Sequence, residues 1–126
     1  MKKKELLLNP LCEAVTHNDK SSFDALIEAG VDVDGTDYNN LTALYYAALY
    51  KQEAMAKVLL DHGAEIEFRD EFGNTPLMEA VYNRDVEMIK LLISHGADIN
   101  AKNNHDVTPK SLSKIIAGFP EIEELK

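Results

Sequence analysis

The apolar residues between Thr75 and Gly96 form two groups, and each group has the spacing of one face of a helix. A threonine hydroxyl accepts hydrogen bonds from the free amides of a first helical turn, and proline at the next position loses no needed donor. Glycine takes the left-handed conformation at a helix C-terminus without steric cost. The pattern therefore predicts two helices between Thr75–Pro76 and Gly96. Their apolar faces are Leu77, Ala80 and Val81, then Val86, Ile89, Leu92 and Ile93.

The same pattern recurs every 33 residues without an insertion. A fixed repeat of this length predicts stacked copies of one supersecondary unit. An end unit shows one face to water, so the first and last copies are expected to depart from the pattern. The repeated columns are Asn9, Thr42, Thr75 and Thr108; Leu11, Leu44 and Leu77; Ala14, Ala47, Ala80 and Ser113; Phe23, Ala56, Ile89 and Ile122; Leu26, Leu59, Leu92 and Leu125; and Gly30, Gly63 and Gly96.

These columns resemble the ankyrin repeat family, whose unit opens its first helix with Thr-Pro-Leu-His-x-Ala. The segments that carry the resemblance are Thr42–Ala47, Leu59–Glu65, Thr75–Ala80 and Leu92–Asn100. The family's histidine is replaced by Cys12, Tyr45, Met78 and Ser111, and Tyr45 is expected to pack against its neighbours.

The resemblance extends from Asn9 to Lys126 and implies an all-α ankyrin repeat solenoid of helix-turn-helix units with projecting finger loops. We expect a single domain over residues 1–126, with repeats at about 6–36, 37–69, 70–102 and 103–126, the first and last as caps. Leucines at the amino end, such as Leu6 and Leu7, are expected to cover the open end of the first repeat. The second helix of the last unit is expected after Pro120, with Ile122 and Leu125 in the apolar columns.

The charge of the chain narrows the classes of partner. With 22 acidic and 13 basic side chains the formal net charge is −9, which repels nucleic acid and anionic membranes. No stretch reaches transmembrane length, and the leucines between Glu5 and Asn9 are too few for a signal peptide. We therefore expect a cytoplasmic, monomeric protein with a protein partner, for which a basic surface fits best.

Patterns typical of catalysis or of a cofactor are missing from the sequence. The histidines His17, His62, His95 and His105 lack the spacings of a metal site. His62 and His95 precede a repeat glycine, where a histidine can bond the last free carbonyls of a helix. There is no glycine-rich phosphate loop and no nucleophile elbow. We expect no enzyme, no cofactor and no small-molecule substrate, and we expect the single cysteine, Cys12, to be buried and inert.

The resemblance implies a protein-interaction module that binds a partner through its finger loops and the concave face of its first helices. Side chains in the loops and at the ends of first helices differ most between repeats, and exposed aromatic residues are enriched at binding surfaces. Two alternatives stay open: an inhibitor or immunity protein that neutralises a basic toxin or nuclease, and an accessory subunit of an enzyme. The candidate protein-binding residues are Tyr38, Asn39, Leu49, Tyr50, Arg69, Glu71, Phe72, Tyr82, Asn83, Lys102 and Asn104.

Overall fold

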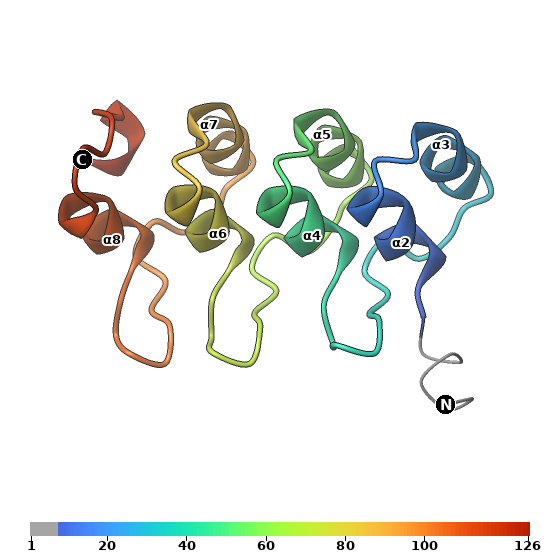
Figure 1. The fold of residues 1–126 in the computed structure, drawn as a ribbon, viewed down its shortest axis with the longest axis horizontal. Helices are drawn as coiled ribbons and strands as arrows, with labels where there is room; N and C mark the ends of the chain where they lie inside the picture. The colour runs from blue at the N-terminus through green and yellow to red at the C-terminus, as the bar shows by residue number, and fades with distance from the viewer. Residues whose placement is uncertain (1–7) are drawn as a thin grey trace.

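Helices stacked in pairs make up the fold of the computed structural model, which describes residues 8–126 (Figure 1). The helices of this part of the chain are α2 (Pro10–Thr16), α3 (Lys20–Glu28), α4 (Ala43–Leu49), α5 (Glu53–Asp61), α6 (Pro76–Tyr82), α7 (Val86–Ser94), α8 (Pro109–Ile115) and the 3₁₀ helix η1 (Glu123–Leu125). The first helices α2, α4, α6 and α8 form one layer, and α3, α5 and α7 form the second. The loops before α4, α6 and α8 project from the first layer as three fingers. The expected all-α solenoid with finger loops is confirmed, whereas the expectation for Leu6 and Leu7 lies outside the described residues.

The first helices begin, and α5 and α7 end, with the local chemistry that the sequence predicts. The hydroxyl of Thr75 accepts the amide of Met78 at 3.3 Å, and Asn9, Thr42 and Thr108 cap their helices in the same way. At the C-terminus of the second helix α5, the Nδ1 atom of His62 lies 2.9 Å from the Val58 carbonyl. The Nδ1 atom of His95 lies 3.0 Å from the Leu91 carbonyl. The predicted capping roles of the threonines and of both histidines are therefore confirmed.

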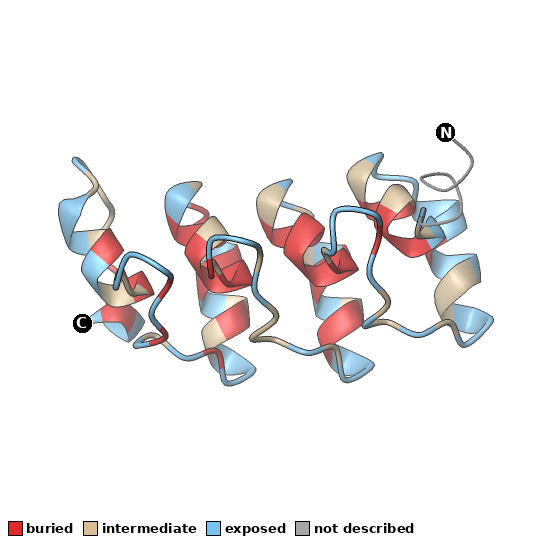
Figure 2. Ribbon diagram, turned by 90° about the horizontal axis from the view of Figure 1, so that it is seen from below, coloured by how far each residue is buried: buried red, intermediate tan, exposed pale blue. Residues whose placement is uncertain are grey.

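The core lies between the two layers and between successive units. Helix α4 contacts α2 and α6 in its own layer and α5 in the other. Ala47 and Ala80, both fully buried, let neighbouring first helices approach closely. Leu59 and Leu92, which lie on α5 and α7, are fully buried between the two layers. In Figure 2 the buried residues follow this seam and are most continuous in the two inner units.

Cys12 is buried as expected, with 1% of its surface exposed. Burial raises the pKa of its thiol to about 12, and the negative charges of Asp37 and Glu13 act in the same direction. A thiol that stays protonated is a poor nucleophile, so Cys12 acts as a small apolar core residue.

The fourth unit departs from the expectation for its second helix. Helix α8 ends at Ile115, the next residue Ile116 is extended, and Gly118 has a φ of +70°. The expected helix after Pro120 is wrong, since only the single 3₁₀ turn η1 forms there. Ile122 and Leu125 nevertheless occupy the predicted apolar columns, with 4% and 3% of their surfaces exposed.

A side chain at the repeat glycine Gly63 is expected to destabilise the fold. Its φ is +81°, and an added Cβ would meet no atom within 4 Å, so a side chain there is disfavoured by backbone conformation alone. We expect Gly63→Val to lower the free energy of unfolding by about 1 kcal/mol or more. Gly73→Ala should cost more than Gly63→Ala, because its Cβ would also lie 2.7 Å from the Asn104 Oδ1 atom and 3.0 Å from the Asn104 amide nitrogen. Urea unfolding measures both effects. An unchanged stability of Gly63→Val would contradict a second helix that ends at this glycine.

Candidate binding surface

The three fingers share one turn, which is built on a single side chain in each. The Oδ1 atom of that side chain accepts the amides two and four residues further along, at 2.8 to 3.2 Å. Aspartate and asparagine favour turns because their short side chains bond to nearby backbone in this way. The residues that organise the fingers are Asp37, Asp70 and Asn103.

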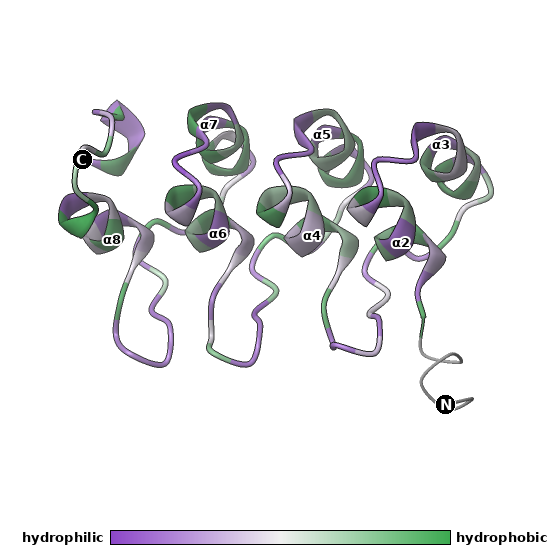
Figure 3. Cartoon of the chain, in the orientation of Figure 1, coloured by the Kyte–Doolittle hydropathy of each residue, from purple (hydrophilic) through white to green (hydrophobic). Residues whose placement is uncertain are grey.

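The role of these three residues in the turns was not predicted from the sequence. Its signal is visible, because the three residues stand 33 positions apart and are all Asp or Asn. The finger loops differ most between repeats, and this column of Asp or Asn within them does not follow the apolar pattern that identifies the helices. Figure 3 shows that the three finger loops are mostly hydrophilic and contain short hydrophobic stretches.

The second and third fingers are bonded to each other near their tips. The Asn104 amide donates to the Phe72 carbonyl at 3.0 Å, and its side-chain Nδ2 donates to the Glu71 carbonyl at 3.0 Å. Arg69 donates from one nitrogen to the carbonyl of Gly73 at 3.1 Å and to that of Lys102. Polar groups of Arg69 and Asn104 thus hold these two fingers in register, and the part of each side chain that stays exposed can still meet a partner.

The candidate residues at the ends of first helices fall into exposed and inward-facing ones. Tyr50 and Tyr82 expose 47% and 45% of their surfaces. Leu49 is half-buried against the core, and the Asn83 side chain donates to the Leu49 carbonyl at 2.9 Å and the Ala48 carbonyl at 3.2 Å. The two tyrosines are therefore the side chains at these ends with most surface available for contact.

An aromatic run connects the first finger to the end of α4. The Tyr46 hydroxyl donates to the Asp37 Oδ2 atom at 2.5 Å, and Asn39 donates to the same hydroxyl at 3.2 Å. The Tyr46 ring stacks on Tyr50, with 6.2 Å between centroids and 4° between planes. The first finger and the C-terminal end of α4 are consequently parts of one surface.

A hollow of about 380 Å³ opens between the first and second fingers. Four of the candidate residues line it, and the exposed fractions of two of these, Tyr38 and Phe72, are 39% and 55%. The hollow is lined by Tyr38, Asn39, Leu41, Asp70, Glu71 and Phe72.

Tyr45 lies at the inner end of the second finger and faces two acidic groups. Its hydroxyl is 2.7 Å from the Asp70 Oδ2 atom and 2.7 Å from the Glu79 Oε1 atom. Burial raises the pKa of Glu79; the hydrogen bond from Tyr45 lowers it, and the charge of Asp70 raises it again. Burial and both acidic neighbours raise the pKa of Tyr45, so the phenol keeps its proton. One hydroxyl proton is therefore shared between two carboxylates.

Replacing Glu79 by glutamine is expected to stabilise the fold at neutral pH. The amide can donate to the Tyr45 oxygen, so the phenol proton is left for Asp70 and one of two like charges disappears. We expect a gain of about 1 kcal/mol, the size of one net hydrogen bond. Because the folded state raises the pKa of Glu79, its stabilising contribution is present below the ordinary value of 4.5 and is lost as pH rises through the folded value. Urea unfolding should show the gain at neutral pH and a smaller one near pH 4.5. A gain that does not depend on pH would contradict this role for Glu79.

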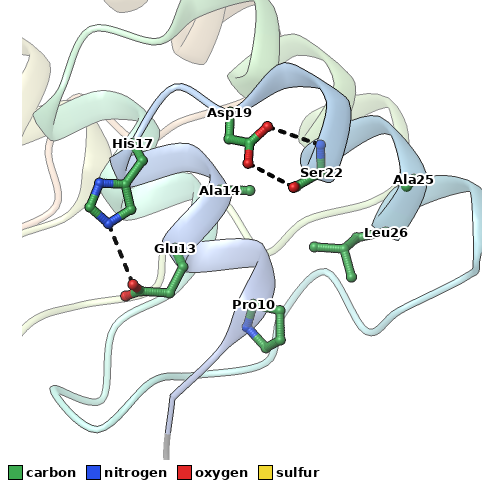
Figure 4. Close-up of a pocket in the computed structure, with 8 residues that line it drawn as sticks. All are labelled: Pro10, Glu13, Ala14, His17, Asp19, Ser22, Ala25 and Leu26. Carbon is green, nitrogen blue, oxygen red and sulfur yellow. Dashed lines mark hydrogen bonds and ion pairs between the residues drawn. The ribbon is translucent and has the colours of Figure 1, made fainter.

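Another hollow, of about 420 Å³, lies at the end of the stack formed by α2 and α3 (Figure 4). Its polar groups pair with each other: His17 lies 3.5 Å from Glu13, and the Ser22 hydroxyl donates to Asp19 at 2.7 Å. The hydrogen bonds that the Ser22 hydroxyl and backbone amide donate to Asp19 lower the pKa of its carboxyl group. Apolar residues of this surface, Pro10, Ala14 and Leu26, correspond one repeat later to Ala43, Ala47 and Leu59, which are at most 1% exposed.

The end hollow is thus the surface that a neighbouring unit covers elsewhere in the stack. Glu13 and Ser22 occupy it where the next repeat carries Tyr46 and Met55, as expected for a terminal repeat. It gives no reason to move the candidate site away from the fingers.

Over residues 8–126 no helix is both long and apolar enough to cross a membrane. The same residues contain no group of three or more histidine, cysteine, aspartate or glutamate side chains that could hold a metal ion. A family model described as ankyrin repeats, in three copies, matches residues 11–103. No curated protein matches the chain.

Proposed function

Because the chain belongs to the ankyrin repeat family, whose repeats are generally protein–protein interaction modules, we propose that it binds a partner protein through its finger loops and the ends of its first helices. One observation carries this proposal. The strongly exposed aromatic side chains of residues 8–126 all belong to these segments, and α3, α5 and α7 expose none of comparable size. They are Tyr38, Tyr50, Phe72 and Tyr82. Large aromatic residues that retain exposure are the usual anchors of protein interfaces.

Capture of the partner from the native host, followed by mass spectrometry, tests the proposal. The wild-type chain is compared with a variant that carries Phe72→Ala and Tyr82→Ala, and with a control, Lys57→Ala, on the exposed face of α5. Proteins captured by the wild type and the control but lost with the double variant support binding through this surface. Equal capture by all three, or recovery of nucleic acid as the main ligand, would overturn it.

The acidic surface should govern the rate at which a basic partner arrives. Long-range attraction between exposed charges is screened by salt, and it affects association more than dissociation. Raising salt from low to physiological concentration should therefore slow association several-fold and change dissociation less. Stopped-flow or surface-binding kinetics with the captured partner would measure both rates. Association that is independent of salt would indicate an apolar, uncharged contact.

A further inference from the structure

The hollow between the first and second fingers combines aromatic and acidic lining. Tyr38 and Phe72 supply rings, Asp70 and Glu71 supply carboxylates, and no lysine or arginine lines it. Aromatic faces attract cations through their quadrupole, and carboxylates pair with them directly. The lining is therefore complementary to a positively charged group with a flat or apolar body.

A comparison with the space between the second and third fingers shows why the hollow between the first and second fingers stays open. Asn104 closes the space between the second and third fingers because its side-chain amide donates to the Glu71 carbonyl. One repeat earlier the same position is Glu71, whose carboxylate has no hydrogen to donate. The position of Arg69, which bonds to the third finger, is Thr36 in the first. Two substitutions in the repeat thus remove the links that would hold the tips of the first and second fingers together.

A second observation is that the hydrogen-bond donors reaching the acidic groups of this region are neutral. The Asp70 Oδ1 atom accepts the backbone amides of Phe72 and Asn74 at 2.9 and 2.8 Å. Tyr45 offers one proton to the carboxylates of Asp70 and Glu79, each 2.7 Å away. Within residues 8–126, none of Asp70, Glu71 and Glu79 has an ion-pair partner. The finger region therefore carries negative charge that no ion pair of the described residues neutralises.

We propose that an arginine side chain of the partner protein enters this hollow, where it contacts the rings of Tyr38 and Phe72 and donates to the carboxylates of Asp70 and Glu71. A guanidinium is favoured over an ammonium because it is planar, stacks on aromatic rings and presents several donors to carboxylates, whereas lysine is a compact and strongly hydrated charge. This inference rests on the proposed function and specifies the chemistry of the partner.

A short blocked peptide with one arginine among alanines tests the proposal on the full chain. Matched peptides carry citrulline, which keeps the shape of arginine without its charge, or lysine. Backbone amide spectra should show saturable shifts at Asn39, Phe72 and Asn74 with the arginine peptide, weaker shifts with lysine and none with citrulline. Equal binding of the citrulline peptide, or shifts spread over the whole surface, would overturn the proposal. Equal affinity for the lysine peptide would overturn the assignment to arginine.

Two variants and a control assign the contacts. Glu71→Gln should weaken arginine-peptide binding by about twofold to fivefold, the range of an exposed ion pair. Phe72→Ala should weaken it by a similar factor through loss of the cation–π contact. Glu28→Gln, which removes the same charge from the exposed end of α3, should leave it unchanged, and an equal loss in this control would reduce the effect to overall charge. If the arginine peptide does not bind while Tyr50→Ala and Tyr82→Ala lose the captured partner, this inference fails and the proposed function stands.

Discussion

Replacing Leu59 by alanine is expected to lower the free energy of unfolding by about 2–5 kcal/mol. Leu59 is fully buried in α5, which packs against α4 in its own unit and α7 in the next. Removing its side chain loses apolar contact and leaves a cavity. Neighbours on both sides hold α5 in place, so the stack can relax into that cavity only in part.

The repeat column of Leu59 provides a matched comparison for the Leu59→Ala variant. Leu26 occupies the place of Leu59 in α3, but it is half-buried and lines the hollow at the end of the stack. Leu26→Ala should cost clearly less, because water already reaches that surface and no closed cavity forms. Urea unfolding of the two variants measures the difference. Equal losses would contradict the position of α3 at an exposed end.

The comparison of these two leucines shows what a repeat pattern can and cannot predict. The pattern identified both as core positions, because helix periodicity and capping are local and are read from a few adjacent residues. How deeply each is buried depends on whether a neighbouring unit covers it, which is a property of the whole stack. The short turn η1 was not predicted for a related reason: Gly118 has a positive φ and Ile122 is extended, and the apolar columns do not reveal either backbone feature.

For the candidate site, too, the sequence predicted the local features and not the contacts between units. The sequence placed Tyr50, Phe72 and Tyr82 in loops or at helix ends, where they are in fact exposed, because these segments have no core face. The internal bonds of Asn83 and Asn104 were not predicted. Each joins residues more than thirty positions apart, so they depend on how closely successive units approach. Whether any of these residues contacts a partner stays a prediction.

Truncation of one exposed aromatic residue is expected to cost about 2 kcal/mol or more of binding free energy, roughly a thirtyfold loss of affinity. The variants are Tyr50→Ala, Phe72→Ala and Tyr82→Ala, made singly. Each side chain exposes 45% to 55% of its surface, so it contributes less to the core than Leu59 does, and the fold should survive its removal. Circular dichroism checks that each variant keeps its helical content before binding is measured. A contact that buries such a ring removes a large apolar area from water, which is why aromatic anchors outweigh the polar contacts around them.

The most direct test of binding through the fingers and first-helix ends is the dissociation constant of the captured partner for the wild type, these three variants and the control Lys57→Ala. Lys57 is exposed in the middle of α5, in the second layer. We expect weaker binding in the aromatic variants and an unchanged constant in the control. Loss of affinity in Lys57→Ala with none in the three aromatic variants would contradict the assignment and indicate recognition through the second helices.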